Sequence, residues 1–175
     1  GKQNYDFKVN HKEVIKEAFF DFEKLFGYKS KTFIAPNYTW GDELEKTTFD
    51  LGIKHLQGRC TQLVPTASKN KLQVRRNFLG KKNKFGQKYL IRNVSFEPFI
   101  NNDKKCVNNA LNEIRNAFYW KKPAIISMHR VNFVGSVNEK NRKVNLELFN
   151  DLLNKIDQYW PNVEFLSSED LTKLI

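Results

Sequence analysis

The sequence is poor in the residues that build disulfide-linked or metal-linked folds. It holds two cysteines, Cys60 and Cys106, and three histidines, His11, His55 and His129, that stand far apart. Two cysteines make neither a disulfide framework nor a metal motif, although one bridge between them stays open. Because no two histidines have the close spacing of a ligand pair, we expect no metal site built wholly within this chain.

Long apolar runs are missing as well. None approaches the roughly 20 residues that a membrane-spanning helix needs, and residues 1–10 are too polar for a secretory signal. The one methionine is Met128, so the chain does not begin with an initiator methionine. We therefore expect a processed product or a piece of a longer protein, which leaves the localisation open.

Acidic residues are absent between residues 51 and 96. The same stretch holds eleven basic residues: Lys54, Arg59, Lys69, Lys71, Arg75, Arg76, Lys81, Lys82, Lys84, Lys88 and Arg92. Of the 30 Lys and Arg residues these eleven leave 19, which equals the number of Asp and Glu, so the formal charge of +11 belongs to this stretch. One interpretation is a surface for an anionic polymer such as a nucleic acid. The preferred one is a solvated basic insertion over residues 59–96, because no nucleic-acid recognition motif accompanies it.

What is present indicates a folded α/β domain. The 40% hydrophobic content, with 15 Phe, 6 Tyr and 3 Trp, argues against disorder, and 175 residues suit a single domain over 1–175. Apolar residues at helical spacing predict helices over residues 10–26, 42–51, 103–118, 142–159 and from 168 onward. Short apolar segments predict strands over residues 31–35, 53–57, 93–98, 124–128 and 163–166, with a hairpin of residues 72–79 and 87–92 in the basic stretch. This alternation predicts mostly parallel strands, in an open sheet or part of a barrel.

Polar side chains follow the predicted strands, most densely in residues 122–133. There the apolar segment 124–128 runs directly into His129, Arg130 and Asn132. Carboxyl ends of parallel strands share one edge of a sheet, the usual place for a site. The same edge is expected to gather residues from the other strands: Asn37, Tyr38, Trp40, Gln57, Arg92 and Glu97. Aromatic rings with amides and an arginine suit a sugar-like ligand, so these residues are candidates for substrate binding.

His129 is the best proton carrier in this set, since histidine gains and loses a proton nearest to neutral pH. The alternative is a histidine hydrogen-bonded beneath a loop. Glu97 is either a base or, as we prefer, the ion-pair partner of Arg92 or Arg130. Trp40 is equally a sugar platform or a core aromatic. His55 lies within a predicted strand and is expected to be a core or face residue.

Three segments resemble the polysaccharide deacetylase-like family, carbohydrate esterases with a distorted (β/α)7 barrel. Residues 32–36 followed by Trp40 resemble the family's strand with an Arg-Pro-Pro type ending, and residues 125–129 resemble its late strand ending in an essential histidine. The most specific part is 122–175, with Arg130, Asn132, Arg142 and the pair Trp160-Pro161. The resemblance implies a partial or complete barrel of this type, with the chain as its carboxyl-terminal portion.

The resemblance also implies an activity. Such enzymes use a carboxylate base and a divalent metal, zinc or similar, to activate water against an N-acetyl or O-acetyl group of a polysaccharide or oligosaccharide, and are often secreted or placed in the cell envelope. It gives the acid role to His129 and places residues 36–40 in the substrate groove. The sequence departs from the family because it has no paired aspartates and no His-x-x-x-His motif, and Ile34 stands where the family has an arginine. Whether this chain alone is an active hydrolase, or a non-catalytic carbohydrate-binding relative, stays open, as does the oligomeric state.

Overall fold

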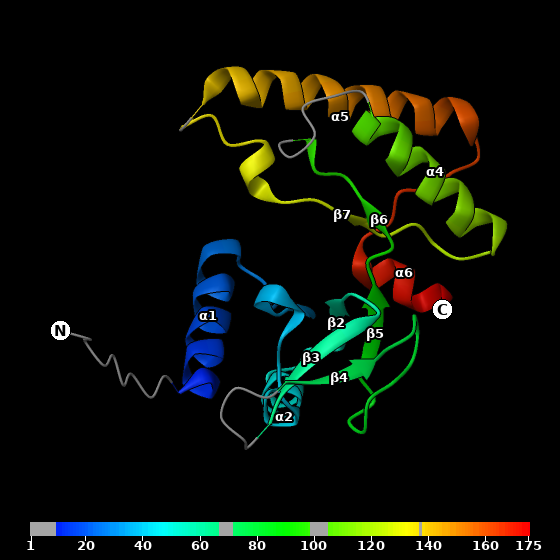
Figure 1. Ribbon diagram of the computed structural model, residues 1–175. Coiled ribbons are helices and arrows are strands. Elements are labelled where there is room, and N and C mark those ends of the chain that lie inside the picture. The colour runs from blue at the N-terminus through cyan, green and yellow to red at the C-terminus, as the bar shows by residue number, and fades with distance from the viewer. Residues whose placement is uncertain (1–9, 67–71, 99–104, 137) are drawn as a thin grey trace. The chain divides into compact units, whose positions relative to one another are not determined.

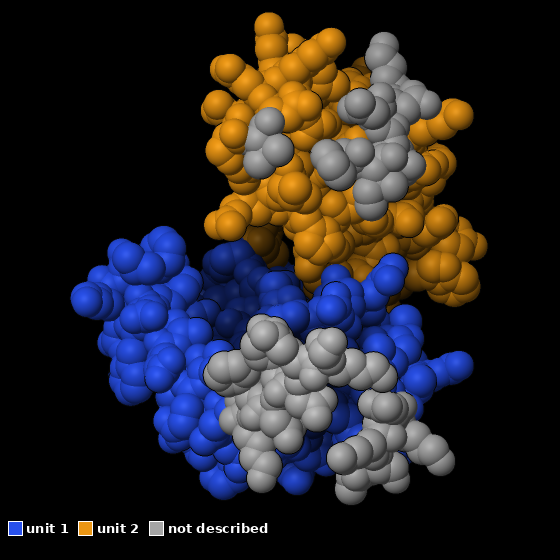
Figure 2. Space-filling view, turned by 60° about the vertical axis from the view of Figure 1, so that its left-hand side comes forward, with its two compact units in different colours: residues 1–91, 167–175 blue, residues 92–166 orange. Residues whose placement is uncertain are grey.

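The structure is a computed structural model that describes residues 10–66, 72–98, 105–136 and 138–175 (Figure 1). It is a mixed α/β fold made of two compact units, residues 1–91 with 167–175, and residues 92–166 (Figure 2). Each unit is described by itself below. No helix within the described residues is long and apolar enough to cross a membrane.

The first unit is built on a parallel three-stranded sheet in the order β1-β2-β5. Its strands are β1 (Thr32–Ile34), β2 (His55–Gly58) and β5 (Lys88–Ile91), paired so that Phe33 lies beside Leu56 and Leu56 beside Tyr89. The helices of this unit are α1 (His11–Phe26), α2 (Asp42–Asp50) and α6 (Ser168–Leu174), and a 3₁₀ turn, η1 (Pro36–Tyr38), follows β1. The predicted strands at 31–35 and 53–57 and their parallel arrangement are confirmed.

Local sequence signals set the helix ends in this unit. Asn10 accepts a hydrogen bond from the Lys12 backbone N–H and begins α1, while Gly27 ends it in the left-handed conformation at φ 74°, which glycine adopts without a steric penalty. Ser167 accepts from the Asp170 N–H and donates to the Asp170 carboxylate, so it caps the start of α6, the helix predicted from residue 168 onward.

The predicted hairpin of residues 72–79 and 87–92 is wrong. Strand β4 (Leu72–Arg76) pairs instead with β3 (Thr61–Pro65) in an antiparallel ribbon, and β5 joins β2 in parallel. The reason is burial: β5 carries Tyr89 and Leu90, which the sheet with β2 buries, whereas the side chains of β4 are largely exposed. The connection between β4 and β5 then runs along the outer edge of β5, where Tyr89 accepts from the Gly80 N–H and donates to the Lys81 carbonyl.

The second unit packs two helices on a short parallel strand pair. The helices are α4 (Lys105–Tyr119) and α5 (Glu139–Tyr159), the strands are β6 (Val94–Ser95) and β7 (Ile126–Ser127), and a 3₁₀ turn, η2 (Arg130–Asn132), follows β7. The predicted apolar face of α4 forms the core with β6 and α5: Val94, Phe96, Val107, Ala110, Leu111, Ile114, Leu152 and Ile156. Helix α5 begins earlier than the predicted residue 142, behind an Asn138 cap, and Tyr159 near its end is half exposed. Residue 103, the predicted start of the preceding helix, lies outside the described residues.

Two strand predictions in this unit need correction. Residues 163–166 form no strand: the Val163 N–H bonds the Trp160 carbonyl in a turn, and Phe165 and Leu166 are exposed. The segment 124–128 contributes only the two residues of β7, which are half-buried rather than covered on both faces. Among the described residues the strands form three separate sheets, of which none closes into a barrel.

Candidate functional site

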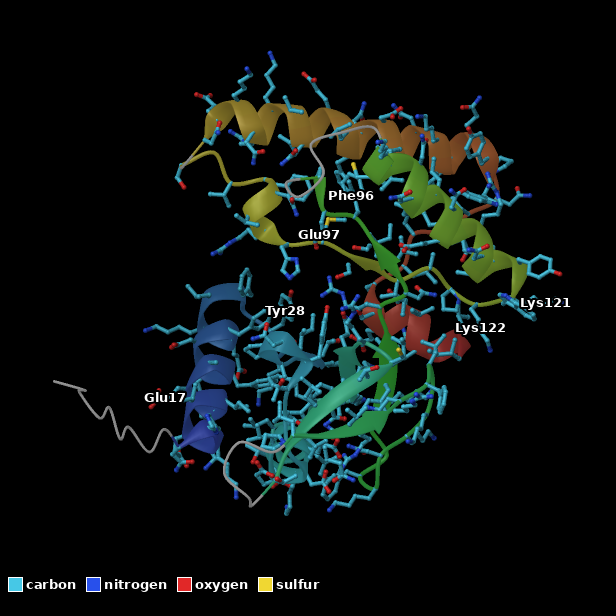
Figure 3. All side chains as sticks on the ribbon, in the orientation of Figure 1. Glu17, Tyr28, Phe96, Glu97, Lys121 and Lys122 are labelled. Atoms are coloured by element: carbon cyan, nitrogen blue, oxygen red, sulfur yellow. The ribbon has the colours of Figure 1, made fainter. Side chains whose placement is uncertain are left out.

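The parallel register of β6 and β7 brings Glu97 and His129 together. Val94 pairs with Ile126 and Ser95 with Ser127, and the Phe96 N–H extends the ladder to the Ser127 carbonyl. Glu97 and His129 each lie two residues beyond the paired serines. Because side chains alternate along a strand, they point to the same face as the serines and lie side by side. Buried Val94 and Phe96 point to the other face, into the core, and so fix the orientation of Glu97 (Figure 3 labels Phe96 and Glu97).

The two side chains form a close acid–base pair. His129 Nδ1 lies 2.6 Å from Glu97 Oε1, within the range of a charge-assisted hydrogen bond. The environments differ, because 67% of the His129 side chain is exposed and only 14% of the Glu97 side chain. A carboxylate at Nδ1 holds the ring in the tautomer that carries a proton there, which leaves Nε2 to exchange a proton with a ligand.

Buried amides hold this pair from behind. Asn132 is fully buried in η2, and its Nδ2 donates to Glu97 Oε2 at 2.7 Å and to the His129 carbonyl at 2.9 Å. Asn145, also fully buried in α5, donates to the Asn132 carbonyl at 2.8 Å. Both oxygens of Glu97 therefore accept hydrogen bonds. Through Asn132 and Asn145, the Glu97–His129 pair and the turn η2 are linked to the core helix α5.

The sequence predicted all three residues of this cluster as site residues, but it preferred an arginine as the partner of Glu97. The structure gives Glu97 a histidine and an amide. Arg130 follows His129 and is exposed, and Arg92 follows β5 and is half-buried. The sequence did not show that Glu97 and His129 pair, because this follows from both residues lying two positions beyond the paired serines. That relation is known only once the register of β6 and β7 is known.

The remaining predicted site residues lie in the first unit. Asn37 and Tyr38 follow β1 with φ values of 50° and 55°, in the left-handed region that costs non-glycine residues about 1–3 kcal/mol each. Such strain concentrates at functional loops. Gln57, near the end of β2, donates to Ser168 Oγ at 2.5 Å and so contributes to holding α6.

Trp40 is a core aromatic and not an exposed sugar platform, the other alternative that the sequence left open. Only 3% of it is exposed, and its ring lies so close to Gly58 that a Cβ there would come within 3.3 Å of Trp40 Cη2. The indole N–H donates to Glu45 Oε1 at 3.2 Å. The ring thus offers no free face to a sugar in this structure.

Glu45 is a buried carboxylate that the sequence reasoning did not single out. It lies in α2, 3% exposed, and its two oxygens accept four bonds: from Trp40 Nε1, Tyr89 Oη, Arg75 Nη1 and Asn83 Nδ2. Burial and the hydrogen bond to Glu45 raise the pKa of the Tyr89 hydroxyl, which stays a donor. Nothing in the sequence marks this group, because its donors come from positions 5 to 44 residues away.

His55 is the buried histidine of the first unit, as the sequence predicted. Its Nε2 lies 3.1 Å from Thr172 Oγ1, whose proton goes to the Glu169 carbonyl at 2.7 Å, so Nε2 is the donor. His55 Nδ1 is buried and has no hydrogen-bond partner. Burial lowers the pKa of His55, against the opposing effect of Glu169.

The described residues do not supply the ligand set that the family resemblance implies for a metal. They hold no group of three or more His, Cys, Asp or Glu side chains that could bind one ion. Glu97 and His129 are bonded to each other, which leaves a single imidazole nitrogen at the surface. The described residues of the cluster therefore do not fit a resident metal ion. Cys60 is exposed and Cys106 is buried, and no disulfide bond joins these two described residues.

Comparison with known proteins adds no assignment: the chain matches no family model, no curated protein and no solved structure.

Proposed function

We propose that the protein is a polysaccharide deacetylase-like protein that removes N- or O-acetyl groups from a glycan, with His129 as its general acid. The observation that carries the proposal is the exposed His129 imidazole held through Nδ1 by the half-buried Glu97. A histidine fixed in this way is a common arrangement for proton transfer near neutral pH. The sequence resemblance assigns the same histidine the same role.

The Glu97–His129–Asn132 cluster can supply the proton that removal of an acetyl group requires. In hydrolysis, water adds to the acetyl carbonyl and the bond from this carbon to the sugar nitrogen or oxygen breaks, which releases acetate. His129 donates a proton from Nε2 to the leaving nitrogen or oxygen, and the proton that the water releases restores it. Glu97 keeps the ring from turning, while Asn132 holds the second oxygen of Glu97. Glu97 is then a positioning residue. This differs from the catalytic base considered from the sequence.

The arrangement of the strands supports the fold part of this proposal. The pairs β1-β2, β2-β5 and β6-β7 are all parallel, and polar residues follow β1, β5, β6 and β7. Parallel strands with polar carboxyl ends are what a (β/α) barrel or a part of one requires. We infer that these strands are part of such a deacetylase-type fold, in which Asn37 and Tyr38 after β1, and Arg130 after β7, are candidate substrate contacts.

Acetate release from acetylated chitooligosaccharides and acetylated xylan, with and without added Zn²⁺, tests the activity. We expect His129→Gln to lower the rate by about 100-fold or more, the range of general acid catalysis. His11→Gln is the matched control, because His11 is exposed at the start of α1 and bonds nothing in the cluster. Undiminished release by His129→Gln would overturn the assigned role.

Non-catalytic glycan binding is the second candidate, favoured by the strained pair Asn37 and Tyr38. Binding of the same oligosaccharides without acetate release, lost in Tyr38→Ala, would support it. Trp40→Ala is a poor probe, because Trp40 is buried and bonds Glu45. Binding unchanged by substitutions at residues 37 and 38 would count against this loop as the groove.

A further inference from the structure

We infer that the first unit carries a docking surface for an acidic polysaccharide, an extended chain bearing carboxylates. This inference rests on the proposed function, because it names the class of glycan. It concerns six exposed cations, here called the basic surface: Lys54, Arg59, Arg76, Lys81, Lys82 and Lys84.

These six cations have no carboxylate partner among the residues that the structure describes. The ion pairs of the unit use other cations, such as Lys31 with Glu169, Lys46 with Asp50 and Arg75 with Asp42. Two cations of the basic stretch serve the fold: Arg75 reaches Glu45, and Lys88 Nζ binds the carbonyls of Thr172 and Ile175. The structure thus separates cations that hold the fold through carboxylates or buried carbonyls from an exposed set whose charge no described carboxylate neutralises, although Lys81 Nζ bonds the Arg76 carbonyl and Lys84 Nζ lies over the Phe85 ring.

Backbone pairing places the members of the basic surface near one another. Arg76 pairs with Thr61, next to the short link after β2 that carries Arg59, and Lys81 Nζ lies 3.3 Å from the Arg76 carbonyl. Lys82 forms a bridge with Lys88, whose N–H bonds the Lys54 carbonyl. The adjacent residues Lys81 and Lys82 join these two groups. Three of the six cations, Lys81, Lys82 and Lys84, therefore lie in the β4–β5 connection, and the other three lie in segments that pair next to it. Figure 1 shows the course of this connection beside β5.

An extended anion fits this surface better than a compact one. The cations are spread along a connection rather than converging on one point, and none of them lies at a buried polar site. Spread positive charge recognises a polyanion by releasing its counterions, which makes binding fall steeply with salt. Phe78, exposed within the same connection, offers an apolar ring beside the charges, which suits the C–H face of a sugar.

Binding can be tested without any readout of acetate. The probe is alginate, a polyuronate, with dextran as the neutral glycan and a single-stranded oligonucleotide of equal charge as the other polyanion. The variant is Arg76→Gln with Lys81→Gln and Lys82→Gln. Its matched control is Lys24→Gln with Lys140→Gln and Lys143→Gln, three exposed cations elsewhere. Circular dichroism of both triple variants checks that they fold.

We expect alginate to bind with an affinity that falls steeply above about 50 mM salt. The basic-surface variant should bind at least about tenfold more weakly with a shallower salt dependence, while the control binds like wild type. An equal loss in both triple variants would overturn the inference, since net charge alone would then explain binding. Tighter binding of the oligonucleotide, or equal binding of dextran, would also overturn it, and neither result bears on acetate release by His129.

Discussion

The two units each hold one glutamate in a network of hydrogen bonds, and the two networks differ in where they end. Glu45 of the first unit accepts from Trp40, Tyr89, Arg75 and Asn83, and it is 3% exposed. Glu97 of the second unit accepts from buried Asn132 on one oxygen and meets exposed His129 on the other. The hydrogen bonds of Glu45 therefore all go to groups held by the fold, whereas Glu97 is linked to solvent through the exposed imidazole of His129.

This difference separates a structural carboxylate from a functional one. The hydrogen-bond partners of Glu45 are all donors held in place by the fold, so the charge of Glu45 stabilises the packing of α2 against β5. Around Glu97 the partner can itself take up and release a proton, so the charge acts on the chemistry of His129. Substitution at Glu45 should therefore cost stability, and substitution at Glu97 should cost activity.

The largest effect is expected for Glu45→Ala. It leaves the buried Trp40 and Tyr89 donors without this acceptor, and it removes one partner each from Arg75, which keeps Asp42, and Asn83, which keeps Gln87. The free energy of unfolding should therefore fall by about 3–5 kcal/mol. Urea unfolding followed by circular dichroism measures it. Glu43→Ala is the control on the same helix, because Glu43 is exposed. A loss below about 1 kcal/mol would show that this network does not hold the unit together.

Glu97→Gln should give the opposite outcome. The amide keeps the shape of the carboxylate but removes the charged acceptor that holds the His129 ring through Nδ1, so acetate release should fall by about 10–100-fold while unfolding changes little. Glu147→Gln, exposed on α5 of the same unit, should leave both quantities unchanged. If Glu97→Gln instead unfolds the protein and leaves the activity per folded molecule intact, the two glutamates have the same role and the contrast fails.

The sequence predicted which residues form the Glu97–His129–Asn132 cluster, but not how the strands pair. These three residues were expected because each lies at or just after the end of a short segment with strand composition, whatever its pairing partner. The pairing of 87–92 with 72–79 was wrong because both segments have strand composition, and only the burial of Tyr89 and Leu90 against β2 decides between them. Glu45 was missed because its donors are far away in the chain, so no local spacing marks it.

Asn145→Ala tests what holds the Glu97–His129 pair in place. Removing the Nδ2 that donates to the Asn132 carbonyl should cost about 1–2 kcal/mol of stability and loosen the turn that carries His129. We expect kcat to fall and KM to stay near its wild-type value, because proton transfer depends on this geometry more than glycan binding does. Asn150→Ala, exposed on the same helix, is the control. A change in KM alone would place Asn145 in glycan binding instead.

The smallest effect concerns the two histidines, which extend the comparison: His129 is exposed beside a carboxylate, and His55 is buried beside a hydroxyl. The pKa of His55 is lowered by burial, with Lys88, Lys54 and Lys31 acting in the same direction and Glu169 against it. The unfolded chain therefore binds a proton at His55 more readily than the folded protein. Its contribution to stability is present above the ordinary histidine pKa of about 6.5 and is lost as the pH falls below that value.

A buried imidazolium would place a proton on His55 Nδ1, which has no acceptor, so acid should loosen α6, whose Thr172 bonds His55. The lowered pKa values of Glu169 and Asp170 act in a lower pH range, below about 4.5, where those carboxylates gain protons. Unfolding midpoints between about pH 7 and pH 5 thus leave out the effect of these two carboxylates. His55→Gln should flatten the decline that wild type and His11→Gln show in this range, and an equal decline in all three proteins would mean that His55 plays no part in it.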